Sequence, residues 1–93
     1  MSKATHFKFR LYVAGGSPNS AKAIANLQAL CHEILNGRHE IEVVDVLKEP
    51  HRALDDGVLL TPMLVKLSPA PISKIIGSLN DRQPVLQALG LPF

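Results

Sequence analysis

The sequence predicts a single mixed α/β domain whose elements follow the order β-α-β-α-β-β-α. Three observations lead to this prediction: an alternating strand at residues 7–13, a helix that begins at Ser17 and Pro18, and a second strand at residues 40–46. A strand, a long helix and a strand in this order form a βαβ unit, whose two strands run parallel with a right-handed crossover. The 93 residues are enough for one domain, residues 1–93, and 46% of them are apolar, which suffices for a core.

The first elements each follow from a local pattern. Apolar side chains occupy the odd positions of residues 7–13, which is typical of a strand with one buried face. Ser17 can cap the helix that follows, and Pro18 suits its first position. Asn36 and Gly37 are expected to end this helix after about five turns.

The middle of the chain is predicted to form a short helix and a buried strand. The helix opens at Pro50 and closes before Gly57. Residues 58–67 are apolar except for one threonine and one lysine, so they are expected to form a buried strand. A bend is expected at Thr61 and Pro62, because proline lacks the N–H that a strand ladder needs.

The end of the chain is predicted to form a short strand and a last helix. Residues 72–76 carry three isoleucines, and Gly77 is expected to end this strand. Asn80 or Asp81 can cap the helix that follows, because both side chains accept hydrogen bonds from free N–H groups. Gly90 is placed to serve as its C-cap.

Composition argues against several classes of function. A net charge of +2, with one tyrosine and three phenylalanines, gives little support for nucleic-acid binding. No apolar run approaches the roughly 20 residues of a membrane-spanning helix, and nothing resembles a signal peptide, so a cytoplasmic protein without membrane contact is expected. The four histidines match no metal-ligand spacing, and neither a metal nor another cofactor is expected.

The predicted order of elements resembles the thioredoxin fold. In such folds a proline at the start of the third strand is usually cis and faces the start of the first long helix. Thr61 and Pro62 stand at this point of the sequence. Only about 5–6% of X–Pro bonds are cis in general, but the topology favours a cis bond before Pro62.

The thiols of a thioredoxin-type enzyme are missing. Such an enzyme needs a cysteine of low pKa at the start of the first helix, where the helix dipole stabilises the thiolate. Residues 15–20 read GGSPNS, which excludes disulfide exchange at that site. The single cysteine, Cys31, lies in the apolar stripe of the helix and is expected to be buried and inert. The alternative is a glutathione- or peroxide-linked thioredoxin relative that lacks the CxxC motif and uses Ser17 or Cys31.

Four blocks of the sequence resemble the KaiB family of circadian-clock proteins. They are residues 11–15 and 17–20 (LYVAG, SPNS), 43–50 (VVDVLKEP), 59–66 and 69–71 (LLTPMLVK, PAP), and 75–82 (IIGSLNDR). The match extends over nearly the whole chain without gaps. The combination is therefore far more specific than any one block.

The resemblance implies a non-enzymatic binding module that docks on the N-terminal ATPase ring of a KaiC-type ATPase. Such a module would regulate circadian timing or a stress response through a population shift toward the state that binds. KaiB proteins can also switch fold: the C-terminal half can form a helix-helix-strand arrangement, with the overall order βαββααβ, that assembles as a tetramer. The resemblance leaves a monomer, a dimer and a tetramer open.

The resemblance assigns partner binding to the short second helix and its flanks. The assigned residues are Lys48, Pro50, Arg52, Asp55, Asp56 and Leu59. Gly57 departs from the family, which has a lysine there. Glu42 also departs, because a basic residue normally stands at this position of the second strand. That strand edge pairs with the regulator KaiA in the family, so Glu40 and Glu42 weigh against KaiA as a partner.

The last residues of the chain form the expected fold-switch segment. Ala88 and Gly90 stand where the family commonly has glycine and aspartate. Alanine favours a helix over glycine by about 1 kcal/mol, Gly90 suits a C-cap, and Pro92 lacks the N–H of a strand residue. Residues 87–92 are therefore expected to favour the thioredoxin-like state over the tetramer-type fold.

Overall fold

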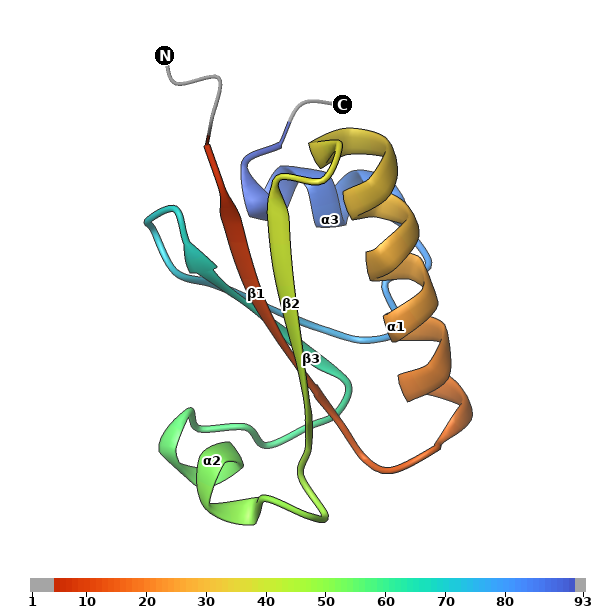
Figure 1. Cartoon of the computed structure of the whole chain (residues 1–93). Coiled ribbons are helices and arrows are strands. Elements are labelled where there is room, and N and C mark those ends of the chain that lie inside the picture. Colours follow the sequence, from red (N-terminus) through yellow and green to blue (C-terminus); the bar gives the residue numbers. More distant parts are fainter. Residues whose placement is uncertain (1–4, 92–93) are drawn as a thin grey trace.

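The computed structural model describes residues 5–91, and Figure 1 shows the arrangement of their elements. In chain order the elements are β1 (Phe7–Val13), α1 (Pro18–Leu30), the π-helical turn η1 (Cys31–Leu35), β2 (His39–Asp45), α2 (Pro50–Asp55), β3 (Met63–Ser68), β4 (Ser73–Ile76) and α3 (Arg82–Leu89). η1 continues α1 directly, so the predicted order β-α-β-α-β-β-α is confirmed.

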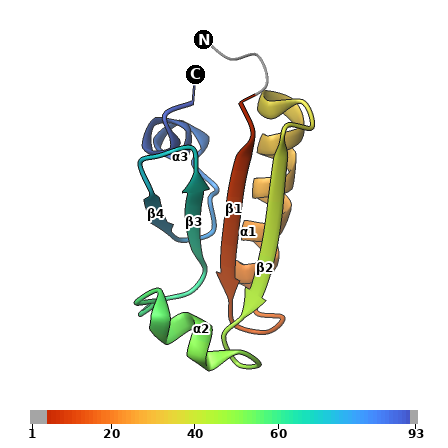
Figure 2. The same cartoon turned by 60° about the vertical axis from the view of Figure 1, so that its left-hand side comes forward.

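The four strands form one sheet in the order β2-β1-β3-β4 (Figure 2). β1 pairs with β2 in parallel, as expected of the βαβ unit, and with β3 in antiparallel orientation. β4 pairs with β3 in antiparallel orientation. In the middle of the sheet, Leu11 of β1 lies opposite Val43 of β2 and Leu64 of β3.

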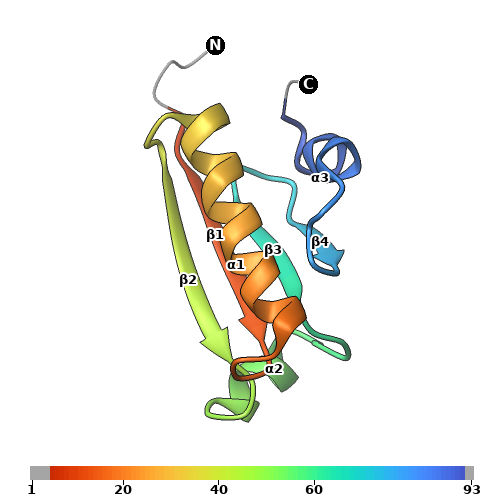
Figure 3. The ribbon, with the colours of Figure 1, turned by 90° about the vertical axis from the view of Figure 1, so that its right-hand side faces the viewer.

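The two faces of the sheet carry different layers. α1 and α3 cover one face, where Leu11, Leu27 and Leu89 belong to the larger of two buried apolar clusters (Figure 3). α2 lies at one end of the other face, over a smaller cluster. The buried members of this smaller cluster are Tyr12, Val44, Ala53, Met63 and Val65.

The first helix begins and ends where the sequence predicted. The Oγ of Ser17 accepts a hydrogen bond from the N–H of Ser20 at 3.3 Å, and Pro18 is the first helical residue. After η1 the chain leaves the helix at Asn36, with φ 50°, and Gly37, with φ 87°. This is the left-handed region in which glycine and asparagine commonly end helices.

The prediction of a buried strand over residues 58–67 is wrong in its first half. β3 begins only at Met63. Pro62 has no N–H to add to a ladder, so it marks the boundary of the strand. Leu59 and Leu60 precede the strand and are 90% and 60% exposed, instead of buried.

Residues Arg82–Leu89 are helical, so residues 87–89 of the expected fold-switch segment have the structure predicted for the thioredoxin-like state. α3 ends in a Schellman motif. In this motif the N–H of Gly90 donates to the carbonyl oxygen of Gln87 at 3.2 Å. The N–H of Leu91 donates to the carbonyl oxygen of Leu86 at 2.9 Å. Gly90 has a φ of 72°, which accounts for glycine at this position.

Two further residues define the end of α3. Ala88 lies exposed in the last turn, where alanine supports the helix. Lys66 of β3 is only 4% exposed, and its Nζ donates to the carbonyl oxygen of Leu89 at 3.3 Å. A cation at a helix C-terminus is favourable, so Lys66 holds the end of α3 against the sheet. Pro92, the third residue of the expected fold-switch segment, lies outside the described residues.

Candidate functional site

The segment between β2 and β3 forms one end of the molecule, with α2 at its centre (Figure 1). Four leucines of this segment are exposed: Leu47, Leu54, Leu59 and Leu60, with exposed fractions of 72%, 75%, 90% and 60%. We name these four residues the leucine surface. Four exposed leucines within one segment of 14 residues make this segment a candidate site of contact with other molecules.

The shortness of α2 explains why these leucines stay exposed. The helix has six residues and buries only Ala53, which packs in the smaller cluster. Successive helical residues point about 100° apart, so Leu54 turns away from the sheet that Ala53 faces. Leu59 and Leu60 lie in the loop before β3, where no strand pairing holds them against the core.

The structure brings all six predicted partner-binding residues to α2 and its two flanks. Four of them are exposed: Lys48, Pro50, Asp55 and Leu59. The other two, Arg52 and Asp56, are half-buried because both form ion pairs with residues of the sheet. The predicted set therefore divides into side chains that face solvent and side chains that attach α2 to the rest of the molecule.

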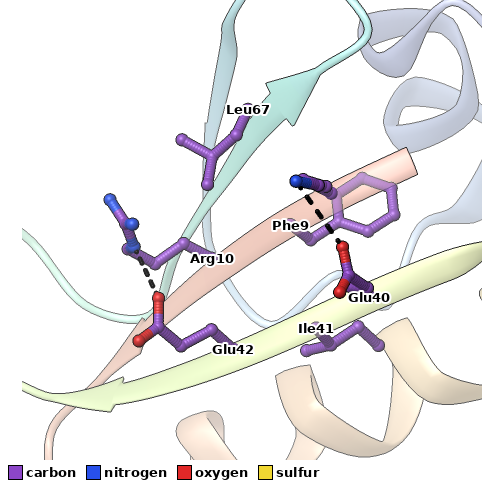
Figure 4. A pocket seen from close by; sticks show the side chains of 7 residues that line it. Phe9, Arg10, Glu40, Ile41, Glu42 and Leu67 are labelled. Carbon is purple, nitrogen blue, oxygen red and sulfur yellow. Dashed lines mark hydrogen bonds and ion pairs between the residues drawn. The ribbon is translucent and has the colours of Figure 1, made fainter. Parts of the chain in front are cut away.

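Arg52 connects α2 to the edge strand β2. Its Nη2 donates to Glu42 Oε1 at 2.7 Å, and its Nη1 donates to Glu49 Oε1 at 3.4 Å. Arg10 of β1 donates to the same oxygen of Glu42 from its Nε at 3.0 Å (Figure 4). The hydrogen bonds from Arg52 and then Arg10 lower the pKa of Glu42 to about 2. Glu42 is therefore ionised at neutral pH and shared between two arginines.

Asp56, directly after α2, is held by three donors. Arg10 Nη1 donates to Asp56 Oδ2 at 3.1 Å, the Tyr12 hydroxyl donates to the same oxygen, and Lys74 Nζ donates to the Asp56 carbonyl oxygen at 2.8 Å. The hydrogen bond from Tyr12, followed by that from Arg10, lowers the pKa of Asp56. Burial and then the contact with Asp56 raise the pKa of Tyr12, so its hydroxyl keeps the proton that it donates.

The start of α1 carries hydroxyl groups where a thioredoxin-type enzyme needs a thiol. Ser17 Oγ donates to Ser20 Oγ at 2.8 Å, and Ser20 Oγ accepts from the N–H of Ala14 at 3.2 Å. Cys31 is fully buried, and burial raises the pKa of its thiol to about 11. Because the thiolate is the reactive form of cysteine, Cys31 is protonated and shielded at neutral pH. The expected buried thiol is confirmed.

Pro62 lies at the same end of the sheet as the start of α1. The residue after it, Met63, pairs with Tyr12 near the end of β1, from which the chain runs into α1. The Thr61–Pro62 peptide bond is cis and Pro62 is buried. The N–H of Gly77 donates to the Pro62 carbonyl oxygen at 2.9 Å, which ties this point to the end of β4.

A shallow groove of about 380 Å³ crosses β1 and β2 on the same face as α2 (Figure 4). Its charged side chains pair with one another: Arg10 with Glu42, and Lys8 Nζ with Glu40 Oε2 at 3.8 Å. Across residues 5–91, no group of histidine, cysteine and carboxylate side chains is arranged to hold a metal ion. Within the same residues, no helix is long and apolar enough to span a membrane.

Comparison with known sequences identifies the family. The family model for the KaiB domain matches residues 10–91. This chain belongs to the KaiB family. The circadian clock oscillator protein KaiB of Microcystis aeruginosa is 45% identical over 87 residues, which cover 94% of this chain and 84% of that protein. A protein of the same name from Prochlorococcus marinus is 42% identical over 93 residues, which cover 100% of this chain and 80% of that protein.

Solved structures place this KaiB-family chain in the thioredoxin-like fold. The N-terminal domain of Synechococcus elongatus SasA aligns with a TM-score of 0.76 at 20% identity, over 97% of this chain and 89% of that domain. Mitochondrial thioredoxin 3 of Saccharomyces cerevisiae aligns with a TM-score of 0.69 at 18% identity, over 94% and 77%. The described residues therefore have the predicted fold class and not the alternative order βαββααβ.

Sequence reasoning missed two parts of this site. Of the leucine surface it singled out only Leu59, although a six-residue helix that buries Ala53 leaves Leu54 exposed. It also missed Arg10 and Tyr12 as the sheet partners of Asp56. Strand alternation places Arg10 and Tyr12 on one face of β1, but their contact with a residue more than 40 positions away depends on where α2 packs.

Proposed function

We propose that this chain is a non-enzymatic binding module that docks on the N-terminal ATPase ring of a KaiC-type ATPase. Docking regulates circadian timing or a stress response, and the proposed location is the cytoplasm. Family membership supports a clock-protein partner, since relatives named circadian clock oscillator protein KaiB align with nearly the whole chain. The observation that carries the proposal is the leucine surface on α2 and its flanks.

The chemistry around α2 suits a protein partner. Protein interfaces commonly have an apolar centre and a polar rim. The leucine surface supplies the apolar part, and the exposed side chains of Lys48 and Asp55 supply charges of both signs beside it. Arg52 and Asp56 attach α2 to the sheet through their ion pairs with Glu42 and Arg10.

A glutathione- or peroxide-linked activity is the competing function. It needs a nucleophile that solvent can reach and that is ionised near neutral pH. Cys31 is buried with a raised pKa, and Ser17 is engaged in capping α1 and in its contact with Ser20. These observations favour a binding module, and the proposal includes no cofactor.

KaiA is left out of the proposed partners. A basic residue at position 42 would offer a cation at the outer edge of β2. Glu42 offers a carboxylate instead, and this carboxylate is already paired with Arg10 and Arg52. A partner that requires a cation at this edge would meet the wrong charge.

The thioredoxin-like form is proposed as the resident state, with any fold switch as a minor excursion. Three contacts support it: the two hydrogen bonds of the Schellman motif and the bond from Lys66 to Leu89. A strand over the same residues would give all three up. A partner that binds the populated form meets little conformational cost.

Binding to the KaiC-type ATPase of the same organism, with and without ATP, tests the proposal. We expect Leu59→Ala to weaken the affinity about tenfold, or by about 1.4 kcal/mol, because docking buries this exposed side chain and the variant removes most of its apolar area. The matched control is Ile72→Ala, which removes an apolar side chain that is 63% exposed between β3 and β4. We expect less than about a twofold change from it. No complex in either nucleotide state, or equal losses in the two variants, would contradict the proposal.

A further inference from the structure

α2 has little apolar contact with the sheet. It buries one side chain, Ala53, whereas the eight residues of α3 bury Val85, Leu86 and Leu89. Burial of apolar surface is the main force that attaches a helix to its sheet, and it grows with the area buried. One methyl group supplies little of this force, so other contacts have to hold α2 in place.

Charged and polar side chains of the sheet supply these contacts. Glu42 of β2 accepts from Arg52 within α2 at 2.7 Å. Arg10 and Tyr12 of β1 donate to Asp56, just beyond the last residue of α2. Arg10 takes part in both contacts, because its Nε reaches Glu42 at 3.0 Å and its Nη1 reaches Asp56 at 3.1 Å. We name these five residues the clamp.

We propose that the clamp, rather than apolar packing, positions α2 and the leucine surface, and that Glu42 is a positioning residue that acts through Arg52 and Arg10. The ion pairs and the Tyr12 hydrogen bond are the observations behind the clamp. The effect of the clamp on docking rests on the proposed function. The four charged side chains of the clamp are 24–48% exposed, so dissolved ions reach them. α2 therefore loosens as ionic strength rises, while α1 and α3 keep the apolar contacts of Leu27, Val85 and Leu89.

Three backbone amides report the opening of α2. The N–H groups of Asp56, Gly57 and Val58 donate to carbonyl oxygens within α2 at 3.2, 3.1 and 2.9 Å. Each of them exchanges with solvent when this end of the helix opens, without unfolding of the whole chain. Hydrogen exchange measured by NMR on the full chain follows these amides with no partner present.

The decisive variant is Glu42→Gln, which keeps the shape of the side chain and removes its charge. We expect the three reporter amides to exchange about fivefold faster, while amides of β1 keep their rates. The matched control is Glu40→Gln, two residues earlier on the same strand. Glu40 pairs with His6 at 3.4 Å and Lys8 at 3.8 Å, and neither lies in α2. We expect this control to leave the reporter amides unchanged.

Salt dependence separates positioning by charge from a merely structural role. In the unmodified chain, an increase in NaCl from about 0.05 to about 0.5 M should speed exchange of the reporter amides about threefold. The same increase should have less than half this effect in Glu42→Gln, because the two ion pairs of Glu42 are gone and only that between Arg10 and Asp56 remains in the clamp. Reporter amides that exchange no faster in Glu42→Gln than in Glu40→Gln would overturn the proposal, as would an equal response to salt in both variants.

The affinity of the Glu42→Gln variant for the KaiC-type ATPase is an independent test of the positioning role of Glu42. Loosening of α2 can weaken binding by no more than the factor by which opening increases. A larger loss of affinity in Glu42→Gln would mean that Glu42 contacts the partner directly, and this would overturn its positioning role. A chain whose α2 responds to salt as expected but which binds no KaiC-type ATPase would contradict the proposed function and leave the clamp in place.

Discussion

The helices on the two faces of the sheet are attached by different kinds of contact. On one face, α1 and α3 cover side chains such as Leu11 and Leu64, which are fully buried. On the other face, α2 adds one buried alanine, and Arg52 and Asp56 attach this segment to the sheet through ion pairs and hydrogen bonds. Apolar burial has no direction and is not screened by salt, whereas ion pairs respond to salt and pH. The apolar contacts of the first face stabilise the fold. On the second face, salt and pH can change how firmly α2 is attached to the sheet.

The largest expected effect comes from the apolar face. Leu64→Ala deletes a fully buried side chain of the larger cluster, and we expect it to lower the free energy of unfolding by about 2–5 kcal/mol. Urea denaturation measures this loss. Leu59→Ala, at a side chain that is 90% exposed, should stay within about 0.5 kcal/mol of the unmodified chain. Similar losses in both variants would remove the distinction between core and docking residues.

A smaller effect is expected where the clamp enters the buried part of the other face. Tyr12→Phe keeps the ring and removes the hydroxyl that donates to Asp56, and we expect a loss of about 1 kcal/mol in unfolding free energy. The same change made on an Asp56→Ala background should cost clearly less, because the carboxylate acceptor is gone and only the contact with the Arg52 carbonyl oxygen at 3.3 Å remains. An equal cost on both backgrounds would show that the hydroxyl acts through something other than Asp56.

The smallest effect is a dependence of stability on acid pH. Arg52 and Arg10 hold the pKa of folded Glu42 at about 2, below its usual value of 4.5, and the pKa of Asp56 moves in the same direction. A carboxylate with a depressed pKa binds fewer protons folded than unfolded, so its contribution is present above about pH 4.5 and is lost as the pH falls toward about 2. Solvent screening at a side chain that is 48% exposed keeps the Glu42 contribution below about 1 kcal/mol.

Urea denaturation at several pH values between about 5 and 2.5 measures this contribution. Glu42→Gln removes the titrating group and should flatten the slope of stability against pH in that range. Glu40→Gln, whose partners lie outside α2, should leave most of the slope in place. An unchanged slope in Glu42→Gln would mean that its ion pairs add nothing to stability.

The apolar face was also the part that the sequence predicted best. The alternation of residues 7–13 and the caps at Ser17 and Gly90 depend on neighbours in the chain, so local patterns revealed them. The interpretation of residues 58–67 failed because an apolar run looks the same whether it is buried or exposed. Only the position of β3, which begins at Met63, shows that Leu59 lies outside the core.

The sequence predicted the location of the site on the other face but not the side-chain contacts within it. The blocks shared with the KaiB family pointed to α2, and the predicted residues do lie there. Leu59 faces solvent, whereas Asp56 faces the sheet. This difference depends on how α2, a helix of under two turns, packs on the sheet. Arg10 and Asp56 lie 46 positions apart, and no local pattern links them.

The contact between Lys66 and Leu89 makes the closure of the core depend on the end of α3. Lys66 is synthesised before α3, as part of β3, and it lies on the sheet face that α3 later covers. An ammonium group without an acceptor is costly to bury, so the burial of Lys66 depends on the carbonyl oxygen of Leu89. A variant that loses the last turn of α3 keeps β3 but loses this acceptor, and the ammonium group then has to stay in contact with water. The last turn of α3 therefore completes the core.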